Sequence, residues 1–194
     1  MAATRIEEVL DTEPSIHDAE QTKGNEKEFS GVLEFHDVGF AYDGAKEEAL
    51  SDISFTARPG ETTAIIGSTG CGKTTLLNLI PRFYDVTSGS ITIDGIDVRE
   101  MSQEKLISLI GYVPQKGVLF SGTIASNLKF AGDQVSDEMM KEAADIAQAV
   151  DFIEEKEEKY NSPIAQGGTN VSGGQKQRLS ICLLYTSDAA DDLI

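Results

Sequence analysis

The stretch that decides the fold is Gly67-Ser68-Thr69-Gly70-Cys71-Gly72-Lys73-Thr74-Thr75, called the phosphate loop below. It fits the pattern G-x-x-x-x-G-K-[ST] at every fixed position. The apolar run at 64–66 predicts a buried strand before the loop, and the apolar spacing at 76–80 predicts a helix after it, ended by Pro81. The alternative is a glycine-rich turn that matches by chance. The strand, loop and helix in this order favour a nucleoside triphosphate site instead.

The residue types in the phosphate loop suit that chemistry. Glycines let the backbone wrap closely around a phosphate, and the unpaired N–H groups at the start of the helix lie in a positive field. Lys73 would neutralise the β- and γ-phosphates, and the Thr74 hydroxyl would take a coordination position on Mg²⁺.

Charge and cysteine content narrow the function classes. The 194 residues carry 16 Lys and Arg against 33 Asp and Glu, a net charge of −17. Such a field repels nucleic acid and anionic membranes, so neither is expected as a direct partner. ATP is not excluded, because local donors and a metal ion set its binding. The two cysteines, Cys71 and Cys182, make no disulfide framework, which indicates a reducing, cytosolic compartment.

The rest of the chain predicts a mixed α/β protein. Residues 1–30 form an acidic appendage with a short helical pattern at 5–10 and a polar linker from 12 to 30. A disordered tail is an equal alternative. From Gly31 onward the patterns predict antiparallel strands, then a nucleotide-binding core, then a helical region. The expected strands are 32–35, 38–42, 49–56, 91–93 and 111–114, and the expected helices are 102–109, 136–150 and 151–160.

A second phosphate-binding pattern lies at Val171-Ser172-Gly173-Gly174-Gln175. This pattern resembles the signature sequence of ATP-binding cassette (ABC) proteins, and residues 176–181 continue it as that family does. A serine hydroxyl and glycine N–H groups at a helix start can grip a γ-phosphate. The alternative is an ordinary Ser-Gly-Gly helix start. The resemblance implies that this signature completes the ATP site of a partner subunit, head to tail.

The resemblance also assigns residues outside the two loops. Tyr42 corresponds to the aromatic that stacks on adenine, and this role is favoured over the alternative that it is a core residue of its strand. Gln115 corresponds to the glutamine that reaches Mg²⁺ and the attacking water, although a glutamine after a proline is usually only a loop residue. Residues 118–124 match the exporter type, in which this stretch touches the transmembrane domain. Residues 165–170 are similar to the exporters' loop for cross-communication with the membrane part.

The fold and function implied by the resemblance can be stated in full. The fold is a P-loop NTPase core of the ABC type with an antiparallel β subdomain and an α-helical signature subdomain, incomplete at the C-terminus. The function is the ATP-binding domain of an exporter at the cytoplasmic face of the cell membrane, with ATP and Mg²⁺ as ligands. Its partners are a second nucleotide-binding domain, identical or not, and the transmembrane domain of the same parent chain. The alternatives are a soluble ABC ATPase without a transport role, and a module that only binds nucleotide.

Both ends of the chain depart from a complete domain. Residues 3–14 resemble the cytoplasmic end of the last transmembrane helix of an exporter, so we expect 1–30 to be the linker that follows it. The nucleotide-binding domain is expected at 31–181. Residues 182–194 resemble the translation of an adapter used in transposase-based sequencing libraries, and we predict a non-native tail there. The family's magnesium-binding Asp, catalytic Glu and switch His all follow this point, so no catalytic residue is expected in the chain.

Overall fold

The computed structural model describes residue 11 and residues 14–132 and 134–186. The helical pattern expected at 5–10 lies outside these residues, as does most of the resemblance at 3–14. The chain divides into two compact units, Met1–Leu109 and Ile110–Ile194, and each is described by itself. No helix among the described residues is long and apolar enough to cross a membrane.

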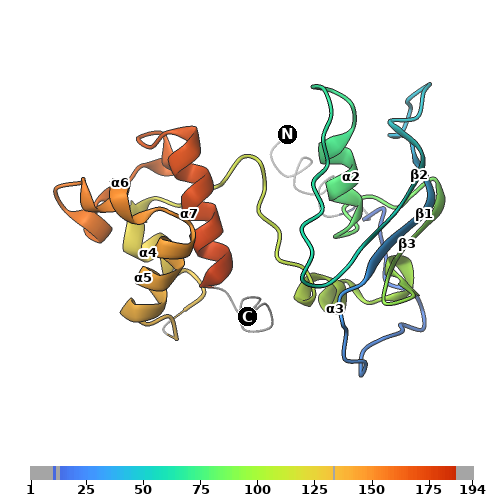
Figure 1. The fold of residues 1–194 in the computed structure, drawn as a ribbon, viewed down its shortest axis with the longest axis horizontal. Coiled ribbons are helices and arrows are strands. Elements are labelled where there is room, and N and C mark those ends of the chain that lie inside the picture. Colours follow the sequence, from blue (N-terminus) through green and yellow to red (C-terminus); the bar gives the residue numbers. More distant parts are fainter. Residues whose placement is uncertain (1–10, 12–13, 133, 187–194) are drawn as a thin grey trace. The chain divides into compact units, whose positions relative to one another are not determined.

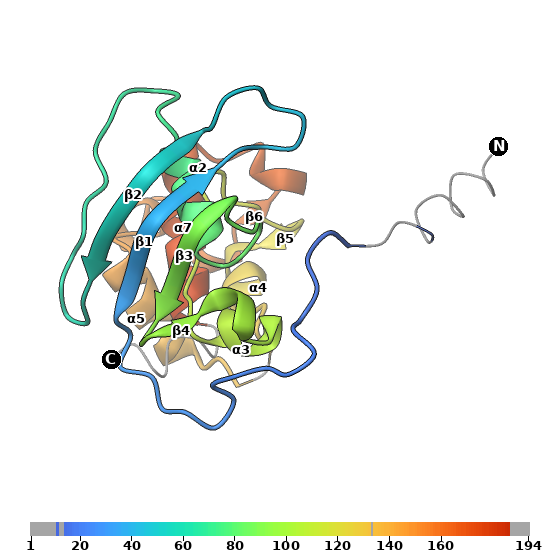
Figure 2. The same cartoon turned by 90° about the vertical axis from the view of Figure 1, so that its right-hand side faces the viewer.

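Unit 1 is built on an antiparallel sheet of four strands in the order β2-β1-β3-β4 (Figures 1 and 2). Its central strand β1 carries a break in register after Phe35, where Asp37 adopts a left-handed φ of 46°. The two strands expected at 32–35 and 38–42 are therefore one bulged strand. The strands are β1 (Leu33–Phe40), β2 (Leu50–Ala57), β3 (Ser88–Ile93) and β4 (Ile96–Asp97).

Three helical segments complete unit 1. They are α2 (Lys73–Leu79), the 3₁₀ turn η1 (Val98–Glu100) and α3 (Gln103–Ser108). Ser102 caps α3, because its hydroxyl accepts a hydrogen bond from the Lys105 N–H at 3.2 Å, as the sequence predicted. The core of the unit contains apolar side chains of the sheet and of these helical segments. Its most buried members include Phe35, Val38, Leu79, Ile91, Met101 and Leu106.

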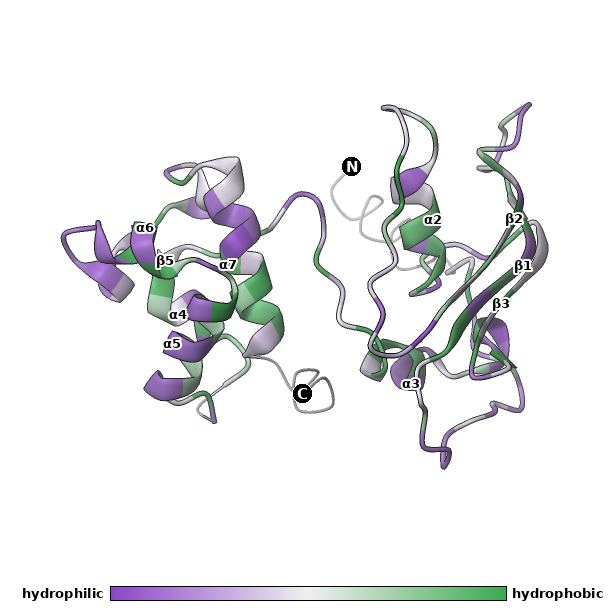
Figure 3. Cartoon of the chain, viewed as in Figure 1, coloured by the Kyte–Doolittle hydropathy of each residue, from purple (hydrophilic) through white to green (hydrophobic). Residues whose placement is uncertain are grey.

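Two strand predictions were wrong. Residues 61–68 form no strand, and the Ile66 side chain in their apolar run is 93% exposed. Figure 3 shows the apolar stretch in the segment that leads to α2. The segment expected as a strand at 111–114 is also irregular. A strand persists when a neighbour pairs with its backbone groups. Among the described residues, neither of these two segments is paired with a strand of either unit.

Unit 2 is mainly helical and packs around its last helix, α7 (Gly173–Tyr185). Ser136 caps α5 as expected, but that helix ends at Ile146, and the expected helix at 151–160 is shorter and broken. The buried core combines residues from α4, α5, α6 and α7, with Leu128, Ala144, Ile153 and Leu179 fully buried. The remaining elements are β5 (Gly122–Thr123), α4 (Ile124–Leu128), α5 (Asp137–Ile146), α6 (Val150–Glu154), η2 (Lys159–Asn161), β6 (Pro163–Ile164) and η3 (Gln166–Gly168).

The start of the predicted non-native tail lies within α7. Cys182 is fully buried in the core of unit 2, and burial raises the pKa of its thiol to about 12. Residues 187–194 lie outside the described part of the chain. The foreign origin of 182–194 therefore stays a prediction.

Asp94 gives unit 1 an acid-sensitive contact. Burial alone would raise the pKa of this carboxyl, but hydrogen bonds from Ser30, Val32 and Gly31 lower it from 3.8 to about 2. The depressed pKa means that the contact stabilises the fold above pH 3.8 and that this contribution is lost as the pH falls through about 2.

We expect Asp94→Asn to lower the melting temperature at pH 7. The difference from the wild type should nearly vanish at pH 2, and a constant difference would contradict the assignment.

Candidate functional site

The phosphate loop leads into the first turn of α2. Gly72 is the N-cap of this helix, with a left-handed φ of 86°, and no side chain caps the helix start. A Cβ at Gly72 would lie 2.8 Å from Leu50 Cδ2 and 2.9 Å from the Ala49 carbonyl oxygen, so only glycine fits. The first turn of α2 contains no acidic residue. Its free N–H groups and positive field therefore suit an anion.

Lys73 folds back over this loop. Its Nζ atom donates hydrogen bonds to the carbonyl oxygens of Gly67 at 2.8 Å and Ser68 at 2.6 Å, and it lies 3.4 Å from Cys71 Sγ. The ammonium thus lies against the loop that would hold a phosphate. A phosphate oxygen is a stronger acceptor than a neutral carbonyl, so it can compete for the same ammonium. Residues 67–71 are all exposed, which leaves the loop accessible.

Tyr42 lies against the same helix. Its hydroxyl is 2.9 Å from the Thr75 hydroxyl in α2. The ring meets Phe40 and Tyr84 edge to face, at centroid distances of 4.8 and 5.4 Å, and remains 40% exposed. The structure therefore brings Tyr42 and the phosphate loop together in one unit. The sequence alone gave no sign of the hydrogen bond or of the contact with Tyr84.

Thr74 and Gln115 are both exposed, but they belong to different units. Their hydroxyl and amide oxygens are the hard donors that suit Mg²⁺. Their pairing on one ion stays a prediction. Among the described residues, no group of three His, Cys, Asp or Glu side chains is placed to hold a metal ion.

The signature begins α7, a helix of 13 residues. Ser172 is its N-cap, and its hydroxyl accepts the Gln175 N–H at 3.3 Å while the Gln175 side chain accepts the Ser172 N–H at 3.0 Å. This reciprocal capping box fixes the start of the helix. A Cβ at Gly173 or Gly174 would meet no atom within 4 Å. Packing inside the unit does not require these glycines, so they leave an open surface at the helix start.

The loop before the signature is held by Asn170. This side chain accepts the Ala165 N–H at 2.9 Å and donates to the Pro163 carbonyl at 2.7 Å. On the other side of the signature, Arg178 donates to the Gln148 carbonyl at 2.6 Å. These contacts fix the entry and first turns of α7. The sequence pattern did not single out either residue for this role.

Comparison with known proteins identifies the family. The family model described as "ABC transporter" matches residues 50–190. The chain therefore belongs to the ABC transporter family. The match extends beyond residue 181, so it sets no domain boundary there.

Several relatives share the sequence at moderate identity. An uncharacterized ABC transporter ATP-binding protein of Mycobacterium bovis is 48% identical over 93% of this chain and 31% of its own length. A β-(1→2)glucan export ATP-binding/permease protein of Rhodopseudomonas palustris is 44% identical over 97% of this chain and 31% of its own. An ATP-dependent lipid A-core flippase of Desulfotalea psychrophila is 41% identical over 97% and 32%. The chain thus spans about a third of the length of these relatives.

A solved structure of a bacterial Atm1-family ABC exporter with ATP bound has the same fold. The TM-score is 0.85 at 32% sequence identity, and the match covers 96% of this chain and 32% of that chain. This confirms the predicted ABC ATPase fold class.

Proposed function

We propose that this chain is the ATP-binding domain of an ABC exporter. The observation that carries the proposal is the hydrogen bond between Tyr42 and Thr75. It joins an exposed aromatic ring, suited to a nucleobase, to the helix that follows the phosphate loop. The triphosphate would lie on the N–H groups of residues 67–75, with the Lys73 ammonium on its β- and γ-phosphates.

Magnesium ion would accompany the nucleotide, with Thr74 and Gln115 as its protein ligands. The ion supplies neutralisation of the phosphate charge when it is bound. The protein residues would orient the phosphates: the N–H groups of the loop would donate hydrogen bonds to the phosphate oxygens, and the Lys73 ammonium would add a positive charge. The function of these residues is positioning and electrostatic stabilisation rather than covalent chemistry.

The proposed roles of the base and of the loop can be separated with a ligand that has no base. Tyr42→Ala should weaken ATP binding about 5- to 150-fold, because base stacking on an aromatic side chain is worth about 1–3 kcal/mol. Binding of inorganic tripolyphosphate should be unchanged. Calorimetry with both ligands on the complete parent domain measures the two effects. An equal loss for both would mean that Tyr42 supports the loop and does not hold the base.

The signature would act on a partner's nucleotide. Ser172, Gly173 and Gly174 lie exposed at the start of α7, and the open space at both glycines lets a phosphate approach the backbone. We infer a second nucleotide-binding domain, identical or different, that binds head to tail. The parent's transmembrane domain would be the other partner, with residues 118–124 at the contact.

Gly174→Ala offers a discriminating test of this role. The substitution adds a methyl group in open space within a helix, so the thermal stability of the domain should stay equal or rise by up to about 1 kcal/mol. ATP hydrolysis by the full-length parent should nevertheless fall, because the methyl group would occupy space needed by the partner's γ-phosphate. A second Gly→Ala change at Gly95 is not a suitable control, because Gly95 has a left-handed φ of 79° that alanine adopts only with strain. Ala125→Gly, a small change in α4 of the same unit, controls for helix effects. Full activity of Gly174→Ala would contradict the signature assignment.

The membrane part of the proposal rests on two of the relatives, one named as an export ATP-binding/permease protein and one as a flippase. We propose that the parent is a membrane protein and that this domain lies on its cytoplasmic face. Residues 1–30 would connect it to the last transmembrane helix. The alternative is a soluble ABC ATPase. Reading the genomic locus upstream of Met1 and expressing the full gene decides between them, because a soluble ATPase would show no transmembrane segments there.

A further inference from the structure

Residues 17–32, called the strap, are attached along unit 1 although they form no helix or strand. The backbone N–H of Lys23 donates to the Glu100 carbonyl at 2.7 Å, and its ammonium pairs with the Glu100 carboxylate at 2.7 Å. Asp18 accepts the Gln103 N–H at 2.8 Å at the start of α3. At the other end, Asp94 accepts hydrogen bonds from Ser30 and from the next two backbone N–H groups. The polar linker expected from the sequence is thus bound at several points.

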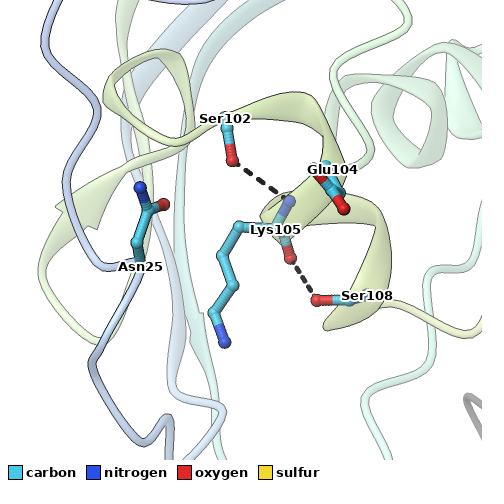
Figure 4. Close-up of a pocket in the computed structure, with 5 residues that line it drawn as sticks. All are labelled: Asn25, Ser102, Glu104, Lys105 and Ser108. Atoms are coloured by element: carbon cyan, nitrogen blue, oxygen red, sulfur yellow. Dashed lines mark hydrogen bonds between the residues drawn. The ribbon is translucent and has the colours of Figure 1, made fainter.

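The attachment combines polar contacts open to water with one half-buried aromatic ring, that of Phe29, whose centroid lies 5.3 Å from the Lys105 ammonium of α3. Where the strap passes α3, the surface forms a pocket lined by Asn25, Ser102, Glu104, Lys105 and Ser108 (Figure 4). The described residues that line this pocket are all polar or charged. The ion pair of Lys23 with Glu100 is also exposed, so its contribution to stability is small. Apart from the Phe29 ring, the strap is therefore held mainly by exposed polar contacts, the kind of contact that opens locally at low free energy.

One contact connects the strap to the end of the phosphate-loop helix. Arg82 lies three residues after Leu79, the last residue of α2, and its backbone N–H donates to the Leu79 carbonyl at 3.1 Å. The residue is only 6% exposed. The guanidinium donates to the His17 carbonyl at 3.1 Å and to both carboxylate oxygens of Asp85 at 2.7 and 3.1 Å. A 3.5 Å contact with the Arg99 carbonyl completes the set. The buried guanidinium thus holds the strap against the exit of α2.

The helix between the two sites is short. It runs from Lys73 in the phosphate loop to Leu79, a distance of about 10 Å for 7 residues at 1.5 Å each. A displacement at its exit is transmitted to its first turn, because a single hydrogen-bonded helix moves as one element. The contact of Arg82 with the strap and the phosphate loop thus lie at the two ends of one short helix.

We propose that Arg82 is a positioning residue that links the strap to the phosphate loop, so that release of the strap weakens nucleotide binding. The inference rests on the proposed function, because it assumes that the loop binds a nucleotide. Linkage requires the effect to be reciprocal: a nucleotide at the loop must tighten the strap by the same factor. A segment upstream of the strap can therefore influence the loop through this one side chain.

A double-mutant cycle in the full-length parent tests the link. The strap variant carries Asp18→Ala and Lys23→Ala, which remove two strap contacts far from the loop. Its affinity for a non-hydrolysable ATP analogue should fall about 5-fold or more. In an Arg82→Gln background the same two changes should have no further effect. The matched control is the double variant Lys129→Ala and Asp137→Ala, which removes an ion pair of 2.6 Å in unit 2. It should leave the affinity for the analogue unchanged.

The outcomes separate the two proposals. Failure of the wild-type parent to bind the analogue would refute the proposed function. Binding with an unchanged affinity in the strap variant, or an equal loss in both backgrounds, would refute the link. Should Arg82→Gln not fold, hydrogen exchange of the wild type replaces the cycle. The analogue must then slow exchange in residues 17–32, and unchanged exchange there overturns the inference.

Discussion

Replacing Lys73 by alanine should weaken ATP binding to the complete parent domain about 10- to 150-fold. A hydrogen bond to a charged group is worth about 1.5–3 kcal/mol, which corresponds to this range of affinity. The structure indicates that this substitution should weaken nucleotide binding without weakening the fold. Within the described part of the chain, the hydrogen bonds of the Lys73 ammonium go to its own loop, at Gly67, Ser68 and Cys71. Its removal therefore takes away no contact between the loop and the core.

Calorimetry with Mg²⁺–ATP measures the change. Lys129→Ala is the control, because this lysine makes an ion pair with Asp137 in the other unit and has no role at the loop. Melting curves of both variants should match the wild type within about 0.5 kcal/mol, as is usual for exposed substitutions. Unchanged ATP affinity in Lys73→Ala would show that the phosphate loop is not the nucleotide site.

The parts of the fold that the sequence predicted well depend on neighbours in the chain. Ser102 and Ser136 cap helices where expected, because a cap uses an N–H only three residues away. The signature serine at 172 begins α7 for the same reason. The strands around Phe35 and Ile91 were found because apolar and polar residues alternate along each of them, which places the apolar side chains on one face of the sheet.

The wrong or missing predictions concern structure that depends on contacts between residues far apart in the sequence. Residues 64–66 have the apolar composition of a buried strand, but composition does not supply a neighbour, and Ile66 is exposed. The attachment of the strap was missed because its contacts join residues 62 to 85 positions apart. Nothing in the local sequence around Asp18 or Asp94 marks these partners.

In the candidate site, too, the local pattern was recognised from the sequence and the long-range contacts were not. The phosphate loop was recognised from nine consecutive residues. The relation of Tyr42 to Thr75 spans 33 positions, and the family resemblance suggested the role of Tyr42 without this hydrogen bond. Arg82 was not noticed, because one arginine after a proline has no pattern of its own. Its importance follows only from burial and from three acceptors that come from different parts of unit 1.

The second large effect concerns turnover: we expect the chain of residues 1–194 not to hydrolyse ATP at a measurable rate. Phosphoryl transfer depends on positioning and on neutralising the developing charge, so a site without one of the groups that do this is slower. By family resemblance, the magnesium-binding Asp, the Glu that polarises water and the switch His would follow residue 181. The two histidines of the chain are His17 in the strap and His36 in β1. The His36 Nε2 atom lies 3.9 Å from a carboxylate oxygen of Glu34 on an exposed part of the sheet.

Purified chain 1–194 with Mg²⁺–ATP, followed by phosphate release, measures this expectation. Lys73→Ala prepared in parallel reports any contaminating ATPase, because a contaminant's activity is the same in both preparations. We expect equal background rates. Nucleotide binding should also be weak, because Ile65 and Ile66 before the loop are exposed and give it little packing support. Release that is robust in the wild type and absent in Lys73→Ala would show that the described loop suffices for catalysis, and the roles assigned to the later family residues would then be wrong.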